Sequence, residues 1–423
     1  MRLQDIDLTD LDSFTASFPH DMFSLLRQQA PVWKHPATSH TPGGEEFWVI
    51  SRYADIEAVA SDAATFSSAG GGGRDGGGTL IEDLPSGFAA GVLFNMMDDP
   101  RHRRIRRLVT PSVSPRSLAA LAADLRRRNA AILDRVAELG EVDFVVEVAA
   151  ELPLQAIALL LGVPQADRHR LFAWANATLD YDDRDLGHHS EKTLAANREM
   201  FEYGRQLLAE KRRQPGDDML SALLLGRVEG EDGNPEPLTE LELQMFFNLL
   251  IAAGSETTRN SVAVGLKALA EHPEQWRLLQ TDASFLPTAI EEMLRWASPT
   301  PYNRRTATRP VELRGQTIRP GEKVTLWWAS ANRDEEVFRE PFRFDIRRDP
   351  NPHLAFGHGS HFCIGANLAR LEMRLIFEGL LERFDTVELM GQVEWTRSNK
   401  HTGVRHMPVR LVPKPNRCRP VPA

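Results

Sequence analysis

A single cysteine set among glycines constrains this chain more than any other feature of its sequence. Residues 356–365 read Phe-Gly-His-Gly-Ser-His-Phe-Cys-Ile-Gly and lead straight into a helical pattern. Glycines let the backbone turn tightly and approach a flat partner closely. The dipole and the free N–H groups of the following helix favour a thiolate over a thiol. The segment therefore predicts a turn that presents the sulfur of Cys363 just ahead of a helix.

Two other interpretations of this cysteine stay open on the residues alone. A lone cysteine beside a turn is most often a buried structural residue. A nucleophile with His361 as its base is the other interpretation, although a spacing of two residues in a tight loop makes a productive ion pair awkward. Such a cysteine hydrolase would carry no pigment.

Composition excludes several classes of protein. The chain has 423 residues and a net charge of −9, which weighs against general nucleic-acid binding. Its two cysteines, Cys363 and Cys418, exclude a disulfide scaffold and a four-cysteine zinc site and indicate a reducing compartment. The N-terminus has no apolar signal core, and no apolar stretch approaches the ~18–20 residues of a membrane helix. We therefore expect a cytoplasmic protein without a membrane anchor.

Helical periodicity dominates the chain, with one small β region. The alternation over 311–328, around Gly315 and Gly321, predicts a small antiparallel sheet. We see no repeat and no interdomain linker, so we expect one domain over 1–423 with a disordered tail at about 414–423. The other expected elements are a strand at 47–50 and helices at 21–30, 53–61, 118–139, 145–161, 167–179, 193–213, 217–225, 239–272, 287–297 and 365–383, with a further helix beginning near 101.

The segment Gly70 to Gly78 is almost entirely glycine. Glycine carries the largest ordering cost of any residue, which argues against regular structure here. The segment is either a mobile surface loop or a lid over a ligand pocket. Composition alone favours the surface loop.

The helical run over 239–272 is unusually long for a globular protein. Thr239 and Glu242 form a capping box at its start. Gly254 in its interior costs roughly 1 kcal/mol relative to alanine, so it calls for a reason such as a flat group pressed against the helix. The neighbouring Glu256 and Thr257 can relay protons, and a hydroxyl can open the helix locally. A surface glutamate beside ordinary threonines is an equally good interpretation of the run by itself.

Residues 356–365 resemble the haem-thiolate loop of the cytochrome P-450 superfamily, F-G-x-G-x-H-x-C-x-G, at every fixed position. The resemblance implies a mainly α fold with a small β region, in which haem lies between a long distal helix and a proximal cysteine loop. It implies that Cys363 is the iron ligand, that His361 contacts a haem propionate, and that Phe356 packs beside the thiolate. Gly357 and Gly365 complete the cofactor loop. Thiolate ligation favours O–O cleavage.

Further motifs of the same family occur in its order along the chain. His102 and Arg106 match its H-x-x-x-R propionate pair, and Arg305 matches a third propionate partner. Helical spacing puts His102 and Arg106 on one face. Buried carboxylates require such cationic partners.

Residues 253–258 resemble the family's oxygen-binding helix, A/G-G-x-D/E-T-T/S, at every position. The resemblance implies that Ala253 and Gly254 lie over the haem. It also implies that Glu256 and Thr257 are the catalytic acid–alcohol pair.

Glu292 and Arg295 match the family's E-x-x-R pair. On the residues alone they would be a surface ion pair worth about 0.5 kcal/mol. The resemblance implies a buried structural pair, with Arg343 or a later arginine as the third member.

The helix expected from residue 101 begins with many basic residues, at 101–107. The simplest interpretation is that these side chains form a solvent-exposed face of the helix. One alternative is a nucleic-acid patch. Another is that Arg103, Arg104 and Arg107 form a docking patch for an acidic iron–sulfur partner.

The resemblance also predicts a distal pocket, apolar with a few polar groups. It draws on the loop before His102, the helix ending near 179, the oxygen helix, the turn after Pro299 and the late turn at 399–401. The glycine segment at 70–78 falls in the pocket-capping loop, which favours a lid. The expected pocket residues are Phe94, Asn95, Met96, Leu179, Leu249, Leu250, Pro301 and Tyr302.

These patterns imply a monooxygenase that uses haem b and O2. No flavin-binding segment is apparent, so two electrons are expected from NAD(P)H through a separate ferredoxin and ferredoxin reductase. Residues 253–261 and 351–354 resemble bacterial members that oxidise a sterol, a terpenoid or a branched lipid, which favours hydroxylation of such a molecule. The alternatives are a tailoring oxidase of an aromatic, polyketide or peptide natural product and a non-catalytic haem-based sensor. The intact Glu256–Thr257 pair argues against a peroxide-driven oxygenase.

Overall fold

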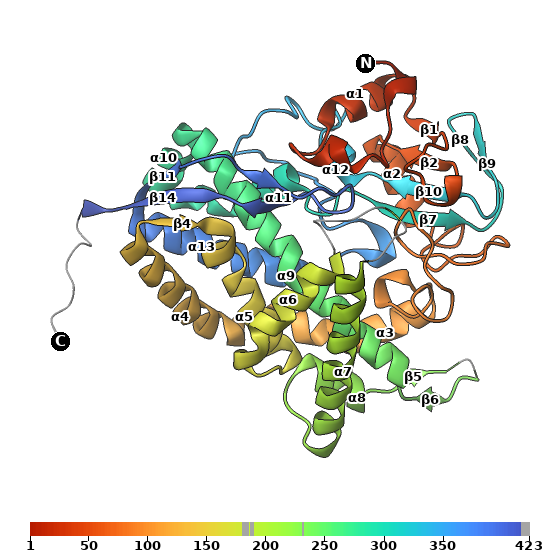
Figure 1. Ribbon diagram of the computed structural model, residues 1–423, viewed down its shortest axis with the longest axis horizontal. Coiled ribbons are helices and arrows are strands. Elements are labelled where there is room, and N and C mark those ends of the chain that lie inside the picture. Colours follow the sequence, from red (N-terminus) through yellow and green to blue (C-terminus); the bar gives the residue numbers. More distant parts are fainter. Residues whose placement is uncertain (180–185, 187–189, 231, 416–423) are drawn as a thin grey trace.

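In the computed structural model, which describes residues 1–179, 186, 190–230 and 232–415, helix α9 (Glu240–Glu271) runs through the middle of the helix-rich part (Figure 1). The helix begins where predicted, because the Thr239 hydroxyl accepts the N–H of Glu242 at 3.2 Å and the Glu242 carboxylate accepts the N–H of Thr239 at 2.8 Å. Pro273 follows its last turn and starts the next helix. The expected 239–272 helix is therefore confirmed to within one residue at each end.

Helices α5, α11 and α13 pack directly on α9, and α4 packs on α13 and α5. Apolar side chains from all of these helices form the largest core cluster. The helices other than α9 are α1 (His20–Gln29), α2 (Tyr53–Ser61), α3 (Arg101–Val109), α4 (Pro115–Leu139), α5 (Glu151–Leu161), α6 (Arg168–Leu179), α7 (Glu191–Arg213), α8 (Met219–Leu225), α10 (Pro273–Thr281), α11 (Leu286–Ala297), α12 (Trp328–Ala331) and α13 (Ala366–Arg383), with short helical turns η4 (Phe94–Met96) and η9 (Gly359–His361), in the described part of the chain.

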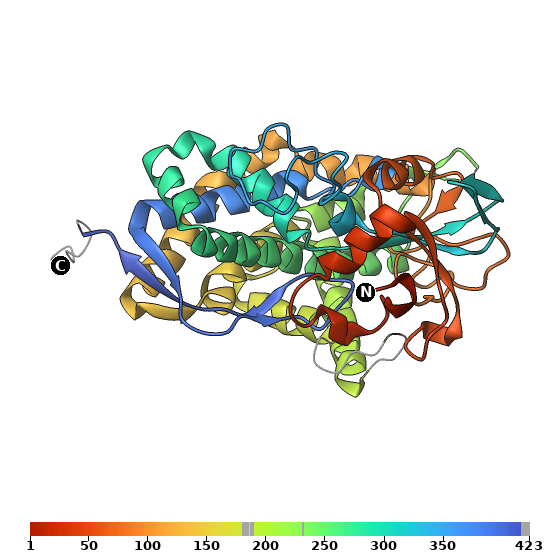
Figure 2. The same ribbon diagram turned by 90° about the horizontal axis from the view of Figure 1, so that it is seen from above.

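A five-stranded sheet lies beside the helices, in the order β1-β2-β10-β7-β3 (Figures 1 and 2). Its strands are β1 (Val32–His35), β2 (Phe47–Ile50), β3 (Phe66–Ser67), β7 (Asn303–Ala307) and β10 (Lys323–Leu326). The expectation of one antiparallel sheet over 311–328 is only partly right. Strands β8 (Val311–Leu313) and β9 (Gln316–Ile318) do form an antiparallel pair. Strand β10 instead pairs in parallel with β2 and antiparallel with β7, because its side chains are buried on both faces.

A second sheet joins segments that are far apart in sequence. Strand β14 (Pro408–Pro413) pairs with both β11 (Phe384–Leu389) and β4 (Glu141–Asp143). Two-stranded ribbons form between β12 (Glu394–Trp395) and β13 (Val404–His406), and between β5 (Val228–Glu229) and β6 (Pro235–Glu236). The fold is thus mainly α with small sheets, as expected.

The glycine-rich segment 70–78 is a loop held in place by hydrogen bonds and ion pairs, and not a mobile surface loop. The N–H of Gly78 donates to Ala69 at 3.1 Å, and a Cβ at Gly77 would lie 1.7 Å from that same carbonyl oxygen. Arg74 forms ion pairs with Glu45 and Asp83. Glycine is therefore needed at Gly77 for close backbone contact, and nothing in this geometry favours a lid.

In the ranges that the structure describes, no helix is long and apolar enough to cross a membrane. The expected tail at 414–423 lies mostly outside the described residues, and its first residue, Lys414, donates its N–H to Arg383 at 2.9 Å.

Candidate active site

Backbone hydrogen bonds and glycines fix the shape of the cysteine loop. The N–H of Cys363 donates to the carbonyl oxygen of Phe356 at 2.9 Å. Gly357 and Gly359 have φ angles of 72° and 75°, in the left-handed region that glycine favours. A side chain at Gly359 is also excluded by space, since a Cβ would lie 2.3 Å from the carbonyl oxygen of Ala60 in α2. The loop therefore delivers Cys363 to the start of α13, as the sequence predicts.

Cys363 is accessible to solvent, although protein atoms surround its thiol closely. Its side chain is exposed. Burial nevertheless raises the pKa of the thiol, against the opposing effects of the Gly365 N–H and of the Arg106 and Arg370 guanidinium groups. A metal cation bound at such a sulfur would deprotonate it outright. The thiol has the access and the cationic surroundings that a metal-binding thiolate needs.

One face of α9 is open at Ala253, in the middle of a helix whose neighbouring residues are buried. Ala253 is exposed, whereas Ser255, Glu256 and Thr258 are buried. Thr257 is half-buried, and its hydroxyl donates to the carbonyl oxygen of Ala253 at 2.9 Å. Ala253 and Thr257 therefore share one face of the helix, one turn apart.

Gly254 has a packing reason that the sequence did not reveal. A Cβ at this position would lie 2.7 Å from Cδ1 of Ile157 in α5. The missing side chain lets α5 approach α9 closely. This contact explains the glycine without a flat group pressed against it.

Four basic side chains, from the three elements α3, η9 and β7, lie together near the cysteine loop. The rings of His102 in α3 and His361 in η9 stack with centroids 4.0 Å apart. Burial and the nearby Arg305, His102 and Arg106 lower the pKa of His361 to about 2. Burial lowers the pKa of Arg305 in β7 to about 10, with Asp98 opposing. Burial also lowers the pKa of His102, so the cluster combines two guanidinium groups with two imidazole rings that favour their neutral form.

The described residues leave part of the hydrogen-bonding capacity of this cluster unused. Asp99 lies 3.5 Å from Nδ1 of His102, yet neither ring nitrogen of His102 forms a hydrogen bond with the described part of the chain. The only recorded bond of the Arg305 guanidinium, among described residues, goes to the carbonyl oxygen of Arg304 at 2.9 Å. Buried cations and unpaired nitrogens are costly, and carboxylates would satisfy them. The donor set fits the two propionates of a haem, with Cys363 available for its iron.

The E-x-x-R pair is fully buried in α11. Arg295 donates to both carboxylate oxygens of Glu292 at 2.7 Å. Arg348 supplies the third member by donating to Glu292 at 3.1 Å. Arg343 contributes its carbonyl oxygen to this network, while its own side chain pairs with Glu340. Of the two options in the prediction, Arg343 or a later arginine, the structure shows the later arginine, Arg348.

This network reaches the cysteine loop through a short chain of bonds. Arg295 donates to the carbonyl oxygen of Asn332 at 2.9 Å, and the side-chain oxygen of Asn332 accepts the N–H of Leu354 at 2.7 Å. The Arg370 guanidinium lies 4.6 Å from the centre of the Phe356 ring. The Glu292–Arg295 network thus ties down the backbone at Leu354, two residues before Phe356, and Arg370 contacts the half-buried Phe356 ring itself.

The expected pocket residues divide into several groups. Phe94 and Met96 are buried in η4, and the Phe94 ring lies 4.7 Å from that of His102. Asn95 is half-buried, and its side-chain oxygen has no hydrogen-bond partner among the described residues. Leu249 is half-buried one turn before Ala253, whereas Leu250 is buried. The side chain of Leu179 lies outside the described residues.

The prediction that Tyr302 lines the pocket is wrong. Its side chain has no exposed surface and belongs to the core cluster of the N-terminal segment. Its ring lies 4.7 Å from that of Trp327, and its hydroxyl accepts the N–H of Ile81 at 3.3 Å. Pro301 is buried beside it. Spacing in the sequence cannot distinguish a core aromatic from a pocket aromatic.

Glu256 lies in a polar cluster that sequence reasoning only partly anticipated. The guanidinium of Arg259, also in α9, lies 3.4 Å from one carboxylate oxygen, and His401 lies 3.5 Å from the other. Burial raises the pKa of Glu256 to about 7, with Arg259 and Asn260 opposing. The carboxyl group can therefore hold or release a proton near neutral pH.

Glu372 is a second buried acid, and none of the sequence motifs includes it. It lies on the buried side of α13, where burial raises its pKa to about 8 against the effect of the nearby Thr258 hydroxyl. One of its carboxylate oxygens has no hydrogen-bond partner in the described ranges. The available signal was an acidic residue within the apolar stripe of the helix.

The three arginines expected to form a docking patch behave differently. Arg104 donates to the carbonyl oxygens of Glu229 at 2.7 Å and Gly230 at 3.3 Å, so it anchors the β5–β6 ribbon. Arg103 and Arg107 are exposed and have no ion pair with any described residue.

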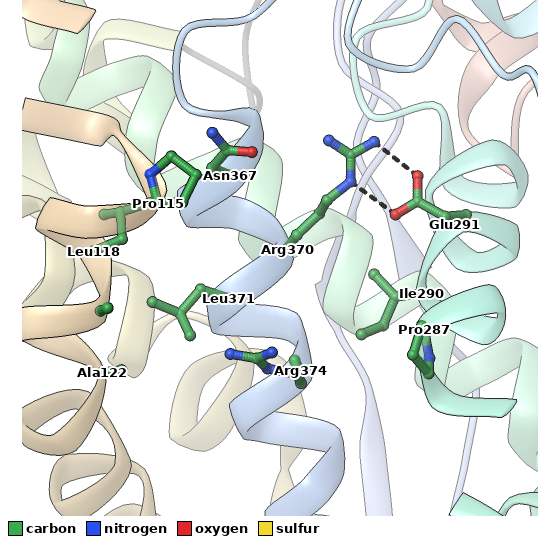
Figure 3. A pocket seen from close by; sticks show the side chains of 11 residues that line it. Pro115, Leu118, Ala122, Pro287, Ile290, Glu291, Asn367, Arg370, Leu371 and Arg374 are labelled. Carbon is green, nitrogen blue, oxygen red and sulfur yellow. Dashed lines mark hydrogen bonds and ion pairs between the residues drawn. The ribbon is translucent and has the colours of Figure 1, made fainter. Parts of the chain in front are cut away.

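A groove of about 410 Å³ lies between α4, α11 and α13, next to the start of the helix that follows Cys363 (Figure 3). Its walls are mostly apolar, with Leu118, Ile290 and Leu371 among them. Arg370 crosses it and pairs through two hydrogen bonds of 2.7 Å with Glu291. None of the expected distal pocket residues lines this groove.

Comparisons with known proteins agree with this geometry. The family model described as Cytochrome P450 matches residues 154–413. A Mycobacterium tuberculosis relative named cytochrome P450 126 is 50% identical over 410 residues, covering 97% of this chain and 98% of the relative. A steroid C26-monooxygenase of Rhodococcus jostii is 37% identical (95% and 84% covered), and a methyl-branched lipid omega-hydroxylase of Mycobacterium bovis is 36% identical (96% and 95% covered). The structure of Mycobacterium marinum CYP268A2 with pseudoionone has a TM-score of 0.85 and 35% identity (95% and 97% covered).

Proposed function

The chain belongs to the cytochrome P450 family, and from this premise we propose that it hydroxylates a sterol, a terpenoid or a branched lipid with electrons from a separate ferredoxin and its reductase. The chain is a P450 monooxygenase, and its family uses haem and O2. The observation that carries the proposal is the exposed Cys363 thiol, presented by a closed loop near four basic side chains. A pure haem-based sensor would need the same loop but not the acid–alcohol pair on α9.

The bound haem supplies the iron centre at which O2 is activated. Cys363 binds the iron as a thiolate, and Phe356 packs beside it. His102, Arg106, Arg305 and His361 would bind the propionates. This assignment is supported by the His102 ring nitrogens, which have no hydrogen-bond partner among the described residues, and by the Arg305 guanidinium, whose hydrogen bond in the described part of the chain goes to the carbonyl oxygen of Arg304. Gly357 and Gly365 keep the loop close to the ring. Ala253, exposed on α9, would line the haem site on the α9 side, with Gly254 beside it where α5 packs on the helix.

Thr257 and Glu256 handle protons on the α9 side. The Thr257 hydroxyl donates to Ala253 at 2.9 Å, and release of that bond would free it to hold a proton beside the reacting oxygen. Glu256 then restores the proton, as the rise of its pKa to about 7 allows.

Electrons are proposed to arrive from NAD(P)H through the ferredoxin. Arg103 and Arg107 are exposed on α3 and would attract an acidic ferredoxin. Arg104 would not take part, because it donates hydrogen bonds to the β5–β6 ribbon.

The preference for a sterol, terpenoid or branched lipid is supported by the relatives that act on steroids and methyl-branched lipids. Phe94, Met96, Leu249 and Leu250 supply apolar surface near the open face of α9. Asn95 offers a polar contact, because its side-chain oxygen is unpartnered in the described part of the chain.

The first test is the spectrum of the dithionite-reduced protein under carbon monoxide. A Soret band at about 450 nm is expected for the wild type and should move to about 420 nm or vanish in Cys363→Ser. Cys418→Ser is the matched control and should keep the band. Retention of the band by Cys363→Ser would refute the ligand assignment, and absence of any Soret band in wild-type protein from haem-supplemented cells would refute the whole proposal.

Substrate class is tested by titrating the oxidised enzyme with cholesterol, a terpenoid, a methyl-branched fatty acid and a macrolide. A change in the iron spin state with one of the first three, at lower concentration than with the macrolide, supports the proposal. The reverse order would favour a tailoring oxidase of natural products.

A further inference from the structure

The turn between β12 and β13 packs directly on α9 beside Glu256. The N–H of Thr396 donates to Gly403 at 2.9 Å, which closes the turn. A Cβ at Gly403 would lie 2.4 Å from the side chain of Asn260, so only glycine permits this approach. The N–H of Thr402 donates to Pro299 at 3.0 Å and anchors the turn from the other side. The backbone therefore holds His401, within this turn, at a fixed place over α9.

The two carboxylate oxygens of Glu256 have different surroundings. Oε1 lies 3.4 Å from the guanidinium of Arg259. Arg259 is itself held by Asn176 in α6 at 3.1 Å and lies 5.7 Å from the centre of the Phe172 ring. Oε2 accepts no hydrogen bond from the described residues, and Nδ1 of His401 lies 3.5 Å away. One oxygen is thus fixed by a cation, and the other faces an imidazole.

We propose that His401 is a positioning and proton-supplying residue that recharges Glu256 from the β12–β13 turn. The inference rests on the proposed function, because it requires Glu256 to return protons to Thr257. It adds a third member to that route, one that comes from an element remote in sequence from α9.

The transfer is a simple exchange of one proton. The His401 imidazolium gives its Nδ1 proton to Oε2 of ionised Glu256, which leaves a neutral imidazole and a carboxylic acid. Glu256 then releases this proton on the Thr257 side of α9 and becomes a carboxylate again. The imidazole takes a new proton from water, because its side chain is 14% exposed whereas that of Glu256 is 2% exposed. No electron moves, and no other bond forms or breaks.

The distance of 3.5 Å is longer than a normal hydrogen bond. Catalytic hydrogen bonds are often long in ligand-free structures and tighten in the working complex. Burial raises the pKa of Glu256 to about 7, so its carboxyl group can take up and release a proton near neutral pH. Arg259 is the other charged group recorded beside Glu256 in the described ranges, and Asn260 is its neutral neighbour.

The test measures peroxide formed per O2 consumed by the holoenzyme, between pH 6 and 8, with a surrogate ferredoxin and reductase and cholesterol as the probe. His401→Gln keeps a hydrogen-bonding side chain but cannot carry a proton. We expect its peroxide fraction to rise severalfold, to match that of Glu256→Gln, and to rise no further in the double variant, because both residues act on one route.

His406→Gln is the matched control. His406 lies in the adjacent strand β13 and also faces a carboxylate, with Nδ1 2.6 Å from Asp143. Its peroxide fraction should stay at the wild-type value. Wild-type behaviour of His401→Gln would overturn the proposal. So would rescue of a defective His401→Ala by glutamine, because that result would indicate a structural role.

A second readout is independent of turnover. The imidazole of His401, identified in the NMR spectrum by its loss in His401→Gln, should titrate at lower pH in Glu256→Gln, since the carboxylate that favours its charged form is gone. An unchanged titration would refute the contact. A normal carbon monoxide spectrum in all variants separates failure of this inference from failure of the proposed function.

Discussion

At the residue scale, the Thr257 hydroxyl is the group whose removal is most informative. In the structure it donates to Ala253 at 2.9 Å, so alanine at this position removes the hydroxyl without breaking the helical backbone. We expect Thr257→Ala to send roughly tenfold more electrons to peroxide per product formed. Product and peroxide are measured against NAD(P)H consumed. Ser255→Ala is the control, because Ser255 makes the same type of bond, to Ile251 at 2.8 Å, with its side chain buried. Unchanged coupling in Thr257→Ala would contradict the proton role.

Glu372 gives a prediction about pH and stability. Burial raises its folded-state pKa to about 8, whereas an unfolded glutamate titrates near pH 4.3. The folded protein therefore binds more protons between these values. The contribution of Glu372 to stability is fully present below about pH 4.3 and is lost as the pH rises to about 8, at a rate of at most about 1.4 kcal/mol per pH unit.

Replacement of Glu372 by glutamine should flatten this dependence. Unfolding of wild type and Glu372→Gln is compared at pH 5.5 and 8 by calorimetry, and the wild type should lose more stability over that interval. Glu378→Gln, a half-exposed acid on the same helix, should retain the wild-type dependence. Equal slopes for wild type and Glu372→Gln would mean that the Glu372 carboxyl is ionised across this range.

At the scale of elements, α11 and the segment after α12 depend on the Glu292–Arg295 pair. Both side chains are fully buried, and Arg348 adds a bond to the same carboxylate at 3.1 Å. Glu292→Gln would leave two arginines without their counter-charge, so we expect a loss of about 3–5 kcal/mol, or no folded protein at all. The thermal midpoint and the haem content of purified protein measure it. Glu291→Gln, which alters a neighbouring and more exposed carboxylate, should cost clearly less. Equal losses would show that burial of the pair is not decisive.

Local signals explain which elements the sequence predicts well. Helix α9 has a capping box at Thr239 and a proline at 273, so both ends can be read from neighbouring residues. The β11-β14-β4 sheet has no comparable signal, because Glu141–Asp143 pairs with a strand that ends at Pro413. The partner of β10 was misjudged for the same reason: parallel pairing with β2 is a long-range choice.

The same distinction between local and long-range signals separates the site residues that the sequence predicts from those that it does not. Motifs named Cys363, Thr257 and Glu256, because their neighbours in sequence define them. Burial and remote contacts decide the rest. Glu372, His401 and the choice of Arg348 over Arg343 depend on segments that meet only in the folded chain.

At the scale of the whole molecule, the candidate haem residues come from both the five-stranded sheet and the helix-rich part of the fold. Arg305 belongs to strand β7 of the five-stranded sheet, His102 and Arg106 belong to α3, and His361 precedes α13. In the described residues neither ring nitrogen of His102 has a hydrogen-bond partner, and the Arg305 guanidinium donates to the carbonyl oxygen of Arg304. A bound group with two carboxylates would therefore stabilise the association of these elements by accepting hydrogen bonds from basic groups that lack partners.

Removal of haem should consequently loosen the protein unevenly. We expect amide hydrogen exchange to rise in α3 (Arg101–Val109), η9 (Gly359–His361) and β7 (Asn303–Ala307), because these elements would lose a shared ligand. Exchange in α4 and in the β11–β14 ladder should change little, since their contacts lie within the protein and provide the internal control. Exchange is measured by mass spectrometry on haem-free and haem-bound protein. A uniform rise, or one that spares α3 and β7, would contradict the assignment of His102, Arg106 and Arg305 to the propionates.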